Sequence, residues 1–260
     1  MTYQTLQVRF EQSGGQHDIA FIQIHRPHAN NTINGQLIEE CLHVLERCRQ
    51  QANVVVLEGT PEIFCFGADF EALMRQADKP ELESQLGPDQ LYDLWTTLAT
   101  GPFVSVAHVR GKTNAGGVGF VAACDLVIAD THAVFSLSEL LFGLMPACVL
   151  PFLIRKIGFQ RSNAMTLSTK PVAVEQAHDW GLVDMYGEKS HLLLGQQLSR
   201  LKRLEKTAIE RYKNYLGSIV PLINSARESA LAANRLVFSD RDNIDKVSRY
   251  VTTKKFPWEA

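Results

Sequence analysis

The stretch from Ala115 to Gly119 most constrains how this chain can fold, because it places small residues between a predicted strand and a predicted helix. The Val-rich segment 103–109 has the pattern of a buried strand, and the apolar residues after Gly117 predict a helix. Ala115, Gly116 and Gly117 leave the backbone N–H groups uncovered where that helix begins. Exposed amides at a helix N-terminus favour an anion, or a carbonyl oxygen that gains negative charge. The sequence therefore predicts a strand, a binding turn and a helix in succession.

A second turn of the same kind occurs earlier in the chain. The buried-strand pattern 54–58 is followed by Phe64-Cys65-Phe66-Gly67-Ala68-Asp69-Phe70 and then by a predicted helix over residues 69–77. Ala68 can offer a second free backbone N–H there. Two amides that converge on one oxygen form an oxyanion hole, so we expect the N–H groups of Ala68 and Gly116 to lie within about 5–6 Å of each other.

Glu139 is a carboxylate in an apolar neighbourhood. The residues around it are Phe135, Leu137, Leu140 and Leu141. Burial among apolar side chains disfavours the ionised form, so the pKa of Glu139 should be raised towards the range that suits general acid–base catalysis. The sequence therefore makes Glu139 the candidate catalytic carboxylate.

The rest of the chain alternates strands and helices before a helical C-terminal part. Residues 3–10 and 19–24 predict a hairpin turning at 13–16, and Asn34 is placed to cap the next helix. The polar segment 76–89 predicts an exposed loop beside the site. Further expected elements are a helix at 90–99, strands at 125–129 and 133–135, short helices at 138–141, 149–156 and 171–177, and helices from 191 to 251. Pro221 and Asp240 are placed at helix starts.

Composition excludes several classes of protein. The chain has 260 residues, of which 45% are hydrophobic, enough for one large core or a core with an appended helical unit. A net charge of −2 without a basic block argues against nucleic acid and anionic membranes as partners. The five cysteines include no Cys-x-x-Cys pair, which indicates buried thiols and neither disulfides nor a metal site. With no signal-peptide pattern or spanning apolar run, we expect a cytoplasmic protein.

The two turns, together with Cys124-Asp125-Leu126-Val127-Ile128-Ala129, resemble the crotonase (enoyl-CoA hydratase/isomerase) superfamily. The resemblance extends from about residue 8 to residue 256. It implies an α/β fold: a spiral core of strand–strand–helix units over residues 1–190, with a C-terminal helical trimerisation region over 191–260. It also implies an oxyanion hole made by Ala68 and Gly116, no cofactor, and a homotrimer or hexamer. An apolar set in the tail is expected to need a covering surface: Leu216, Ile219, Val220, Leu222, Ile223, Leu231, Leu236 and Val237.

One position departs from the two-glutamate hydratases of that superfamily. Their first catalytic carboxylate lies two residues past the Gly-Gly pair, where this chain has Gly119, and Glu139 matches the second. A single Glu can still move the proton alpha to a thioester carbonyl, with the enolate held in the oxyanion hole. The same Glu could then assist loss of a C3 hydroxyl or return the proton at C4. Spacing leaves dehydration and isomerisation both open.

A closer resemblance is to the PksH-type dehydratases of bacterial polyketide pathways. It rests on segments such as Asn30–Asn34, Phe64–Phe70, Phe135–Gly143, Pro146–Arg155 and Phe256–Glu259. It implies dehydration of a 3-hydroxy-3-methylglutaryl thioester, carried by phosphopantetheine on an acyl carrier protein, to the 3-methylglutaconyl thioester. The alternative is a single-Glu isomerase or hydratase acting on CoA thioesters.

The resemblance also indicates residues that contact the substrate. These are His28, Ala29, Phe66, Asp69, Asn114, Gly117 and Cys148. His28 is expected near the pantetheine, Asn114 near a water or the leaving hydroxyl, and Asp69 also as a helix cap. Lys112, His108, Lys170 and Arg155 are candidate cations for the distal carboxylate, although each also suits a structural role.

A non-catalytic or RNA-binding relative is the alternative of another class. RNA-binding members of the superfamily use lysine-rich helices, and the helix predicted at 36–51 contains no lysine. The retained Glu139 and both small-residue turns argue against a scaffold without activity.

Overall fold

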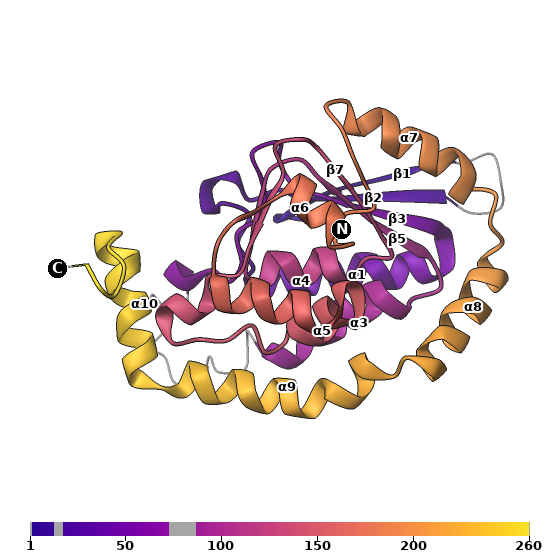
Figure 1. Cartoon of the computed structure of the whole chain (residues 1–260). Helices are drawn as coiled ribbons and strands as arrows, with labels where there is room; N and C mark the ends of the chain where they lie inside the picture. The colour runs from indigo at the N-terminus through magenta and orange to yellow at the C-terminus, as the bar shows by residue number, and fades with distance from the viewer. Residues whose placement is uncertain (1, 13–17, 73–86, 260) are drawn as a thin grey trace.

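A mostly parallel sheet of six strands forms the centre of the part of the chain that the structure describes (Figure 1). The computed structural model describes residues 2–12, 18–72 and 87–259. In spatial order the strands are β1 (Leu6–Glu11), β2 (Asp18–Ile24), β3 (Ala52–Glu58), β5 (Val104–Val109), β7 (Leu126–Ala129) and β10 (Met185–Tyr186). β1 and β2 are antiparallel, as the predicted hairpin requires, and every other neighbouring pair is parallel. The predicted turn at 13–16 lies outside the described residues.

A second sheet of short strands carries the turns of the candidate site. It consists of β4 (Ile63–Cys65), β6 (Lys112–Asn114), β8 (Val134–Ser136) and β9 (Val172–Ala173). Each of β3, β5 and β7 is followed by one of these strands and then by a helical turn, which confirms the predicted strand–strand–helix units. The sequence predicted β8 but not β4 or β6.

Helices cover both faces of the large sheet. The helices α1 (Gly35–Gln51), α3 (Pro88–Thr100), α4 (Gly116–Ala123) and α5 (Leu150–Ser168) lie on one side, and α7 (Ser190–Leu201) lies on the other (Figure 1). Asn34 caps α1 as predicted, with its Oδ1 accepting a hydrogen bond of 2.9 Å from the N–H of Leu37. The aromatic rings of Trp95, Phe120 and Phe152 meet edge to face in the core between α3, α4 and α5.

α5 is longer than the sequence predicted. The helix expected at 149–156 continues to Ser168, although Gly158 has φ +78° and interrupts the helical conformation. Apolar residues beyond Gly158, including Met165, are buried in the core. Gly158 therefore separates two helical segments across a kink, and the sequence predicted only the first of them. The short α6 (Val174–Asp179) follows.

The C-terminal helices form a band along one edge of the core (Figure 1). They are α8 (Lys206–Ile219), α9 (Leu222–Ser239) and α10 (Arg241–Thr253), and Asp240 caps α10 through the N–H of Asp242. The expectation that the whole apolar tail needs an external surface is wrong in part. Ile223, Leu231 and Val237 are buried within this chain. Three others, Ile219, Val220 and Leu236, are exposed at 56%, 41% and 69%.

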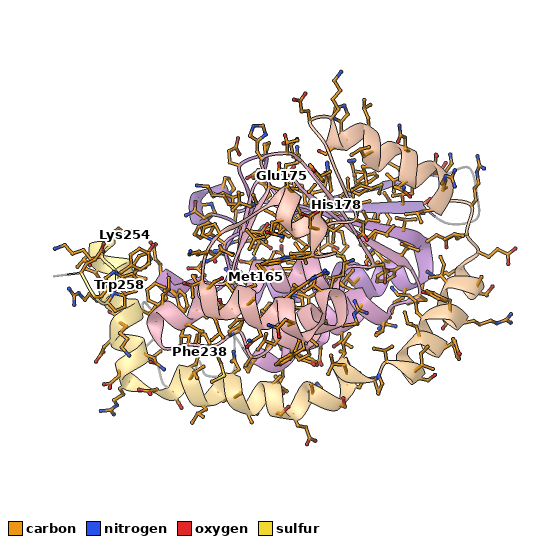
Figure 2. The ribbon with its side chains drawn as sticks, in the orientation of Figure 1. Met165, Glu175, His178, Phe238, Lys254 and Trp258 are labelled. Carbon is orange, nitrogen blue, oxygen red and sulfur yellow. The ribbon has the colours of Figure 1, made fainter. Side chains whose placement is uncertain are left out.

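An aromatic cluster at the end of the chain holds the short helix that contains Glu139. Phe142, in η3 (Glu139–Phe142), contacts the rings of Tyr250 and Phe256 at centroid distances of 5.1 and 6.0 Å. Phe256 in turn stacks on Trp258 at 4.9 Å. Figure 2 shows Trp258 and Lys254 beyond α10, well apart from Met165 among the core helices. Residues more than one hundred positions away therefore support η3.

Several other expectations can be compared with the described residues. All five cysteines are free and buried, as predicted. Of the polar loop predicted at 76–89, residues 76–86 lie outside the described part of the chain, as does most of the helix predicted at 69–77. Across residues 2–12, 18–72 and 87–259, no helix is both long and apolar enough to cross a bilayer.

Candidate active site

The two small-residue turns lie against each other. Gly67 has φ +88°, a left-handed conformation that suits glycine, and a Cβ built on it would lie 2.8 Å from Ala115 Cβ and 3.4 Å from Gly116 N. The turns are therefore in direct contact and do not lie on opposite faces of the protein. Contact between the two turns is a precondition of the predicted oxyanion hole, and the predicted separation of the Ala68 and Gly116 N–H groups stays a prediction.

The amides of Ala68 and Gly116 are free to bind a ligand. Within the described residues, neither N–H donates a hydrogen bond to the protein, whereas the neighbouring N–H groups of Asp69 and Ala115 both do. Ala115, just before α4, has φ +51°, an unfavourable conformation for a residue with a side chain. Strain of this kind persists where the surrounding structure imposes it, often at functional sites. Two unpaired donors thus belong to turns that are in contact, and their convergence on one oxygen stays a prediction.

A buried ion pair holds the first of these turns in place. Arg26 Nη2 donates to Asp69 Oδ2 at 2.8 Å, with both side chains less than a tenth exposed. The other oxygen, Asp69 Oδ1, accepts from the N–H of Ala72, which confirms the predicted helix cap. The backbone of Ile33 pairs with the turn on both sides, accepting from Asp69 N and donating to Gly67 O. Because both oxygens of Asp69 are engaged and buried, the expected contact between Asp69 and substrate is wrong, and its role is to support the turn.

The carboxylate of Glu139 is desolvated by burial. The residue as a whole is half-buried, but Oε2 is fully enclosed and has no hydrogen-bond partner in the described part of the chain. Burial raises the pKa of Glu139 to about 7, against a smaller opposing effect of the backbone N–H groups of Glu139 and Ser138. Both protonation states are then accessible near neutral pH, as predicted for an acid–base catalyst.

Asn114 ties the oxyanion turn to the segment that carries Glu139. Its Oδ1 accepts from Ser136 Oγ at 2.8 Å, and its Nδ2 donates to Ser138 Oγ at 3.0 Å. The N–H of Ala115 also donates to the Ser136 carbonyl at 2.9 Å. Asn114 therefore fixes β6 to β8 and to the segment that leads to Glu139. Its expected contact with a water or hydroxyl stays a prediction.

The place of the missing carboxylate is filled by an aromatic ring. A Cβ built on Gly119 would lie 2.4 Å from Trp95 Cζ2, 2.5 Å from Cη2 and 2.8 Å from Cε2. Such distances are far below van der Waals contact. Trp95 and Gly119 are therefore complementary, and any side chain at position 119 requires the indole to move.

The remaining predicted substrate-binding residues differ in their placement. His28 is exposed and Ala29 half-buried in the 3-10 turn η1 (Pro27–Ala29) on the loop that packs on Gly67, and Phe66 is 39% exposed next to Gly67. Gly117 packs directly on the Cys65 carbonyl. These four stay predictions. The placement of Cys148 is a correction: its thiol lies in the core facing the Ala230 carbonyl at 3.9 Å, and burial raises its pKa to about 12.

Two of the candidate cations are structural. His108 lies on the face of the sheet covered by α7, bonded to Glu58 at 2.8 Å and Ser190 at 3.0 Å. Arg155 donates to the carbonyls of Ala122 and Ala123 at the end of α4. Lys112 and Lys170 are exposed. The structure therefore assigns none of these four residues to the distal carboxylate of the expected substrate.

Sequence reasoning missed Arg26 and Trp95. An arginine in a Pro-rich loop has no local signal of burial, since its partner Asp69 lies 43 positions away. Trp95 could have been noticed as a tryptophan on the buried face of a predicted helix, but only the fold brings it against Gly119.

The comparisons with known proteins agree with this geometry. The model of the enoyl-CoA hydratase/isomerase family matches residues 14–260. The chain belongs to this family. Membership confirms the resemblance and the crotonase-type fold inferred from the sequence.

Individual relatives show which members of the family this chain is similar to. The bacillaene synthase dehydratase PksH of Bacillus subtilis is 52% identical over all of this chain and 98% of its own length. The crystal structure of pksH from Bacillus subtilis, described as a polyketide biosynthesis enoyl-CoA hydratase, superposes with a TM-score of 0.93, covering 98% of this chain and 100% of that one. The 2,3-dehydroadipyl-CoA hydratase of Escherichia coli is 29% identical over 86% of this chain and 87% of its own length. The chain is accordingly an enzyme of the hydro-lyase type.

Proposed function

We propose that this enzyme dehydrates a 3-hydroxy-3-methylglutaryl thioester to the 3-methylglutaconyl thioester, with the acyl group carried on an acyl carrier protein. The observation that carries the proposal is the single buried carboxylate of Glu139 in a site whose second carboxylate position holds Gly119 and the ring of Trp95. Such a site has one proton-transfer group and one oxyanion hole. Removal of water across C2 and C3 needs no more than these.

The proposed reaction uses Glu139 twice. The ionised carboxylate takes the C2 proton, and the electron pair of the C2–H bond moves towards the thioester carbonyl as an enolate. The amides of Ala68 and Gly116 stabilise the negative oxygen. The enolate then re-forms the carbonyl, the C2=C3 bond forms and the C3–O bond breaks. The departing hydroxyl receives the proton from Glu139 and leaves as water, so that the carboxylate is regenerated.

The choice of a carrier-bound branched substrate is supported by the relative that is 52% identical over the full chain and is named a bacillaene synthase dehydratase. A polyketide synthase keeps its intermediates as carrier-protein thioesters, and the exposed His28 on the loop beside Gly67 is suitably placed to meet a pantetheine arm. A free CoA thioester is the alternative acyl carrier.

A second candidate function is isomerisation of an enoyl thioester or hydration of a CoA substrate. It is favoured by the same lone Glu139, which could return the proton at C4, and by the named CoA hydratase at 29% identity. Isomerisation leaves the mass of the acyl group unchanged, whereas dehydration removes one water. The two reactions are therefore separable by mass alone.

Mass spectrometry of the loaded carrier protein tests the proposed function. The enzyme is incubated with 3-hydroxy-3-methylglutaryl carrier protein and, in parallel, with the same acyl group on CoA. We expect loss of one water, faster on the carrier protein. No loss of water from either thioester, with a correctly folded enzyme, would exclude the dehydratase assignment.

We also propose that the C-terminal helical region, which the sequence places at 191–260, mediates a homotrimer or a hexamer. Support comes from α8, which leaves a cavity of about 740 Å³ beneath it. The cavity is lined in part by Ile209, Leu216 and Val220, and Tyr212, Tyr215 and Ile219 are exposed on the same helix. Apolar surface of this kind favours a covering partner. Light scattering that gives a stable single chain at micromolar concentration would contradict this assembly.

A further inference from the structure

Three polar side chains interrupt the apolar layer between the large sheet and α7. Valines of β3 and β5 and a leucine of α7 form this layer. Glu58, at the end of β3, continues the row of valines that face α7, and His108 of β5 is its neighbour across the parallel strands. Ser190 is the first residue of α7. The dehydration proposed above uses none of these three residues.

The three side chains form one hydrogen-bonded chain. Ser190 Oγ lies 3.0 Å from His108 Nε2, and His108 Nδ1 lies 2.8 Å from Glu58 Oε1. Burial alone would raise the pKa of Glu58, but the hydrogen bond from His108 and nearby positive charges lower it below its ordinary value. The ionised carboxylate then keeps a proton on Nδ1, so that Nε2 accepts from the Ser190 hydroxyl.

This order of groups is that of a nucleophile, a general base and a carboxylate that orients the base. A serine hydroxyl is a weak nucleophile until a hydrogen-bonded histidine takes its proton. The same arrangement of serine, histidine and a carboxylate performs acyl transfer on several unrelated folds, so it is recognised by geometry and not by position in the chain.

A cavity of about 450 Å³ borders the chain of hydrogen bonds. Its lining includes Glu58, His108 and Ser190, together with Phe21 of β2 and charged residues of the neighbouring strands. This volume is within the range of small-molecule sites. The cavity lies on the α7 side of the sheet, whereas α4, which begins at Gly116, lies on the other side (Figure 1). It is therefore separate from the candidate active site.

The start of α7 adds donors next to the serine. The N–H groups of Ser190 and His191 donate to no protein acceptor within residues 2–12, 18–72 and 87–259. Lys189, at the N-cap position, makes no side-chain cap bond. Unpaired N–H groups at a helix start favour an oxygen that gains negative charge, as a carbonyl oxygen does when a nucleophile attacks it.

We propose that Ser190, His108 and Glu58 form a second site, which hydrolyses an ester or thioester of a short acyl group. Ser190 Oγ attacks the acyl carbonyl while His108 Nε2 takes its proton. The bond to the leaving alcohol or thiol then breaks, and that group receives the proton from His108. Water attacks the acyl-serine in the same way, which releases a carboxylic acid and restores the hydroxyl. This inference does not depend on the proposed dehydration.

Covalent labelling of the unmodified enzyme is the first test, and it needs no variant. A fluorophosphonate transfers its phosphonyl group to an activated serine and loses fluoride. After incubation, digestion and mass spectrometry locate the label in the sequence. We expect it on Ser190. Absence of label from Ser190 in the folded enzyme would overturn the inference.

Hydrolysis of p-nitrophenyl acetate is the second test, followed by the absorbance of the released nitrophenolate. Ser190→Ala and His108→Gln should each lower the rate at least about 100-fold, because a nucleophile and a general base are lost in turn. Ser199→Ala is the matched control, since Ser199 lies exposed on the same helix with its Oγ bonded to the Gln196 carbonyl. It should alter neither hydrolysis nor labelling.

Glu139→Gln separates this site from the dehydration site. It should leave ester hydrolysis unchanged, whereas Ser190→Ala should leave dehydration unchanged, with circular dichroism as the control for folding. Equal loss of ester hydrolysis in Glu139→Gln would overturn the inference, because the reaction would then belong to the dehydration site. Full hydrolysis by a folded Ser190→Ala variant would overturn it as well. Absence of dehydration by the unmodified enzyme would instead refute only the proposed function.

Discussion

The ring of Trp95 occupies the space that any side chain on Gly119 would need, since Cζ2 lies 2.4 Å from the position of a Gly119 Cβ. The loss of a carboxylate at position 119 is therefore matched by a bulky residue from another helix. The space at position 119 is therefore filled by the Trp95 ring. The site is not a hydratase site with an empty place where one carboxylate was removed. It also changes what a substitution at position 119 can achieve.

Gly119→Glu by itself should not introduce a usable carboxylate. The new side chain meets the buried indole, and overpacking of this kind typically destabilises a protein by about 1–3 kcal/mol or more. Gly119→Glu combined with Trp95→Ala should recover part of that stability, because the two changes are not additive for residues in contact. Thermal unfolding of both variants checks this, and equal melting temperatures would contradict it.

Glu139→Gln should abolish most of the activity while preserving the fold. The amide keeps the shape of the side chain but cannot exchange a proton. A general base contributes about 10²–10⁴-fold, so dehydration should fall at least that far. Rates of water loss from the carrier-bound substrate, with circular dichroism as the control for folding, provide the measurement. Near-normal turnover would move the base to another group.

The pH profile of the reaction should follow the raised pKa of Glu139. Burial brings this pKa to about 7, and only the ionised carboxylate can take the C2 proton. The ratio kcat/KM should therefore rise about tenfold per pH unit below 7 and level off above it. A profile that is flat between pH 5 and 8 would show that Glu139 is not the group whose ionisation limits the rate.

Stability should depend on pH through the same residue. Its folded pKa of about 7 lies above the ordinary value of 4.5, so its contribution is fully present below 4.5 and is lost as the pH rises to about 7. The gap corresponds to about 3 kcal/mol. Denaturant unfolding at pH 4.5 and pH 8 should show that Glu139→Gln stabilises the protein at pH 8 relative to the unmodified chain. If the two proteins differ in free energy of unfolding by the same amount at pH 4.5 and at pH 8, the stability does not depend on ionisation of Glu139.

Arg26→Met should destabilise the protein strongly. It leaves the Asp69 side chain buried without its partner, and breaking a buried pair in this way costs about 3–5 kcal/mol. Because Asp69 also caps the helix after the oxyanion turn, activity should fall with stability. The double variant Arg26→Met/Asp69→Leu removes both charges and should unfold at a higher denaturant concentration than the single one. If it does not, the ion pair is not the source of the effect.

The sequence by itself determined the chemistry-bearing parts of this protein. The small residues at Gly67 and Gly116 indicate where backbone N–H groups can stay uncovered at a helix start. Small residues in such places also allow close packing, as Gly117 does against the Cys65 carbonyl. The apolar residues around Glu139 likewise predict its raised pKa, since desolvation by neighbours close in the chain is a local property. The strand–helix alternation follows from hydrophobic periodicity in the same way.

Only the tertiary structure decided which distant residues complete the site. Trp95 fills the space at Gly119, Arg26 pairs with Asp69, and Tyr250 supports η3 through Phe142. Cys148 and His108, both plausible from their positions in the chain, turn out to face α9 and α7. Such contacts join residues tens of positions apart or more, and local patterns carry no record of them. They are fixed when the helices pack on the sheets, because shape complementarity then selects one partner for each buried group.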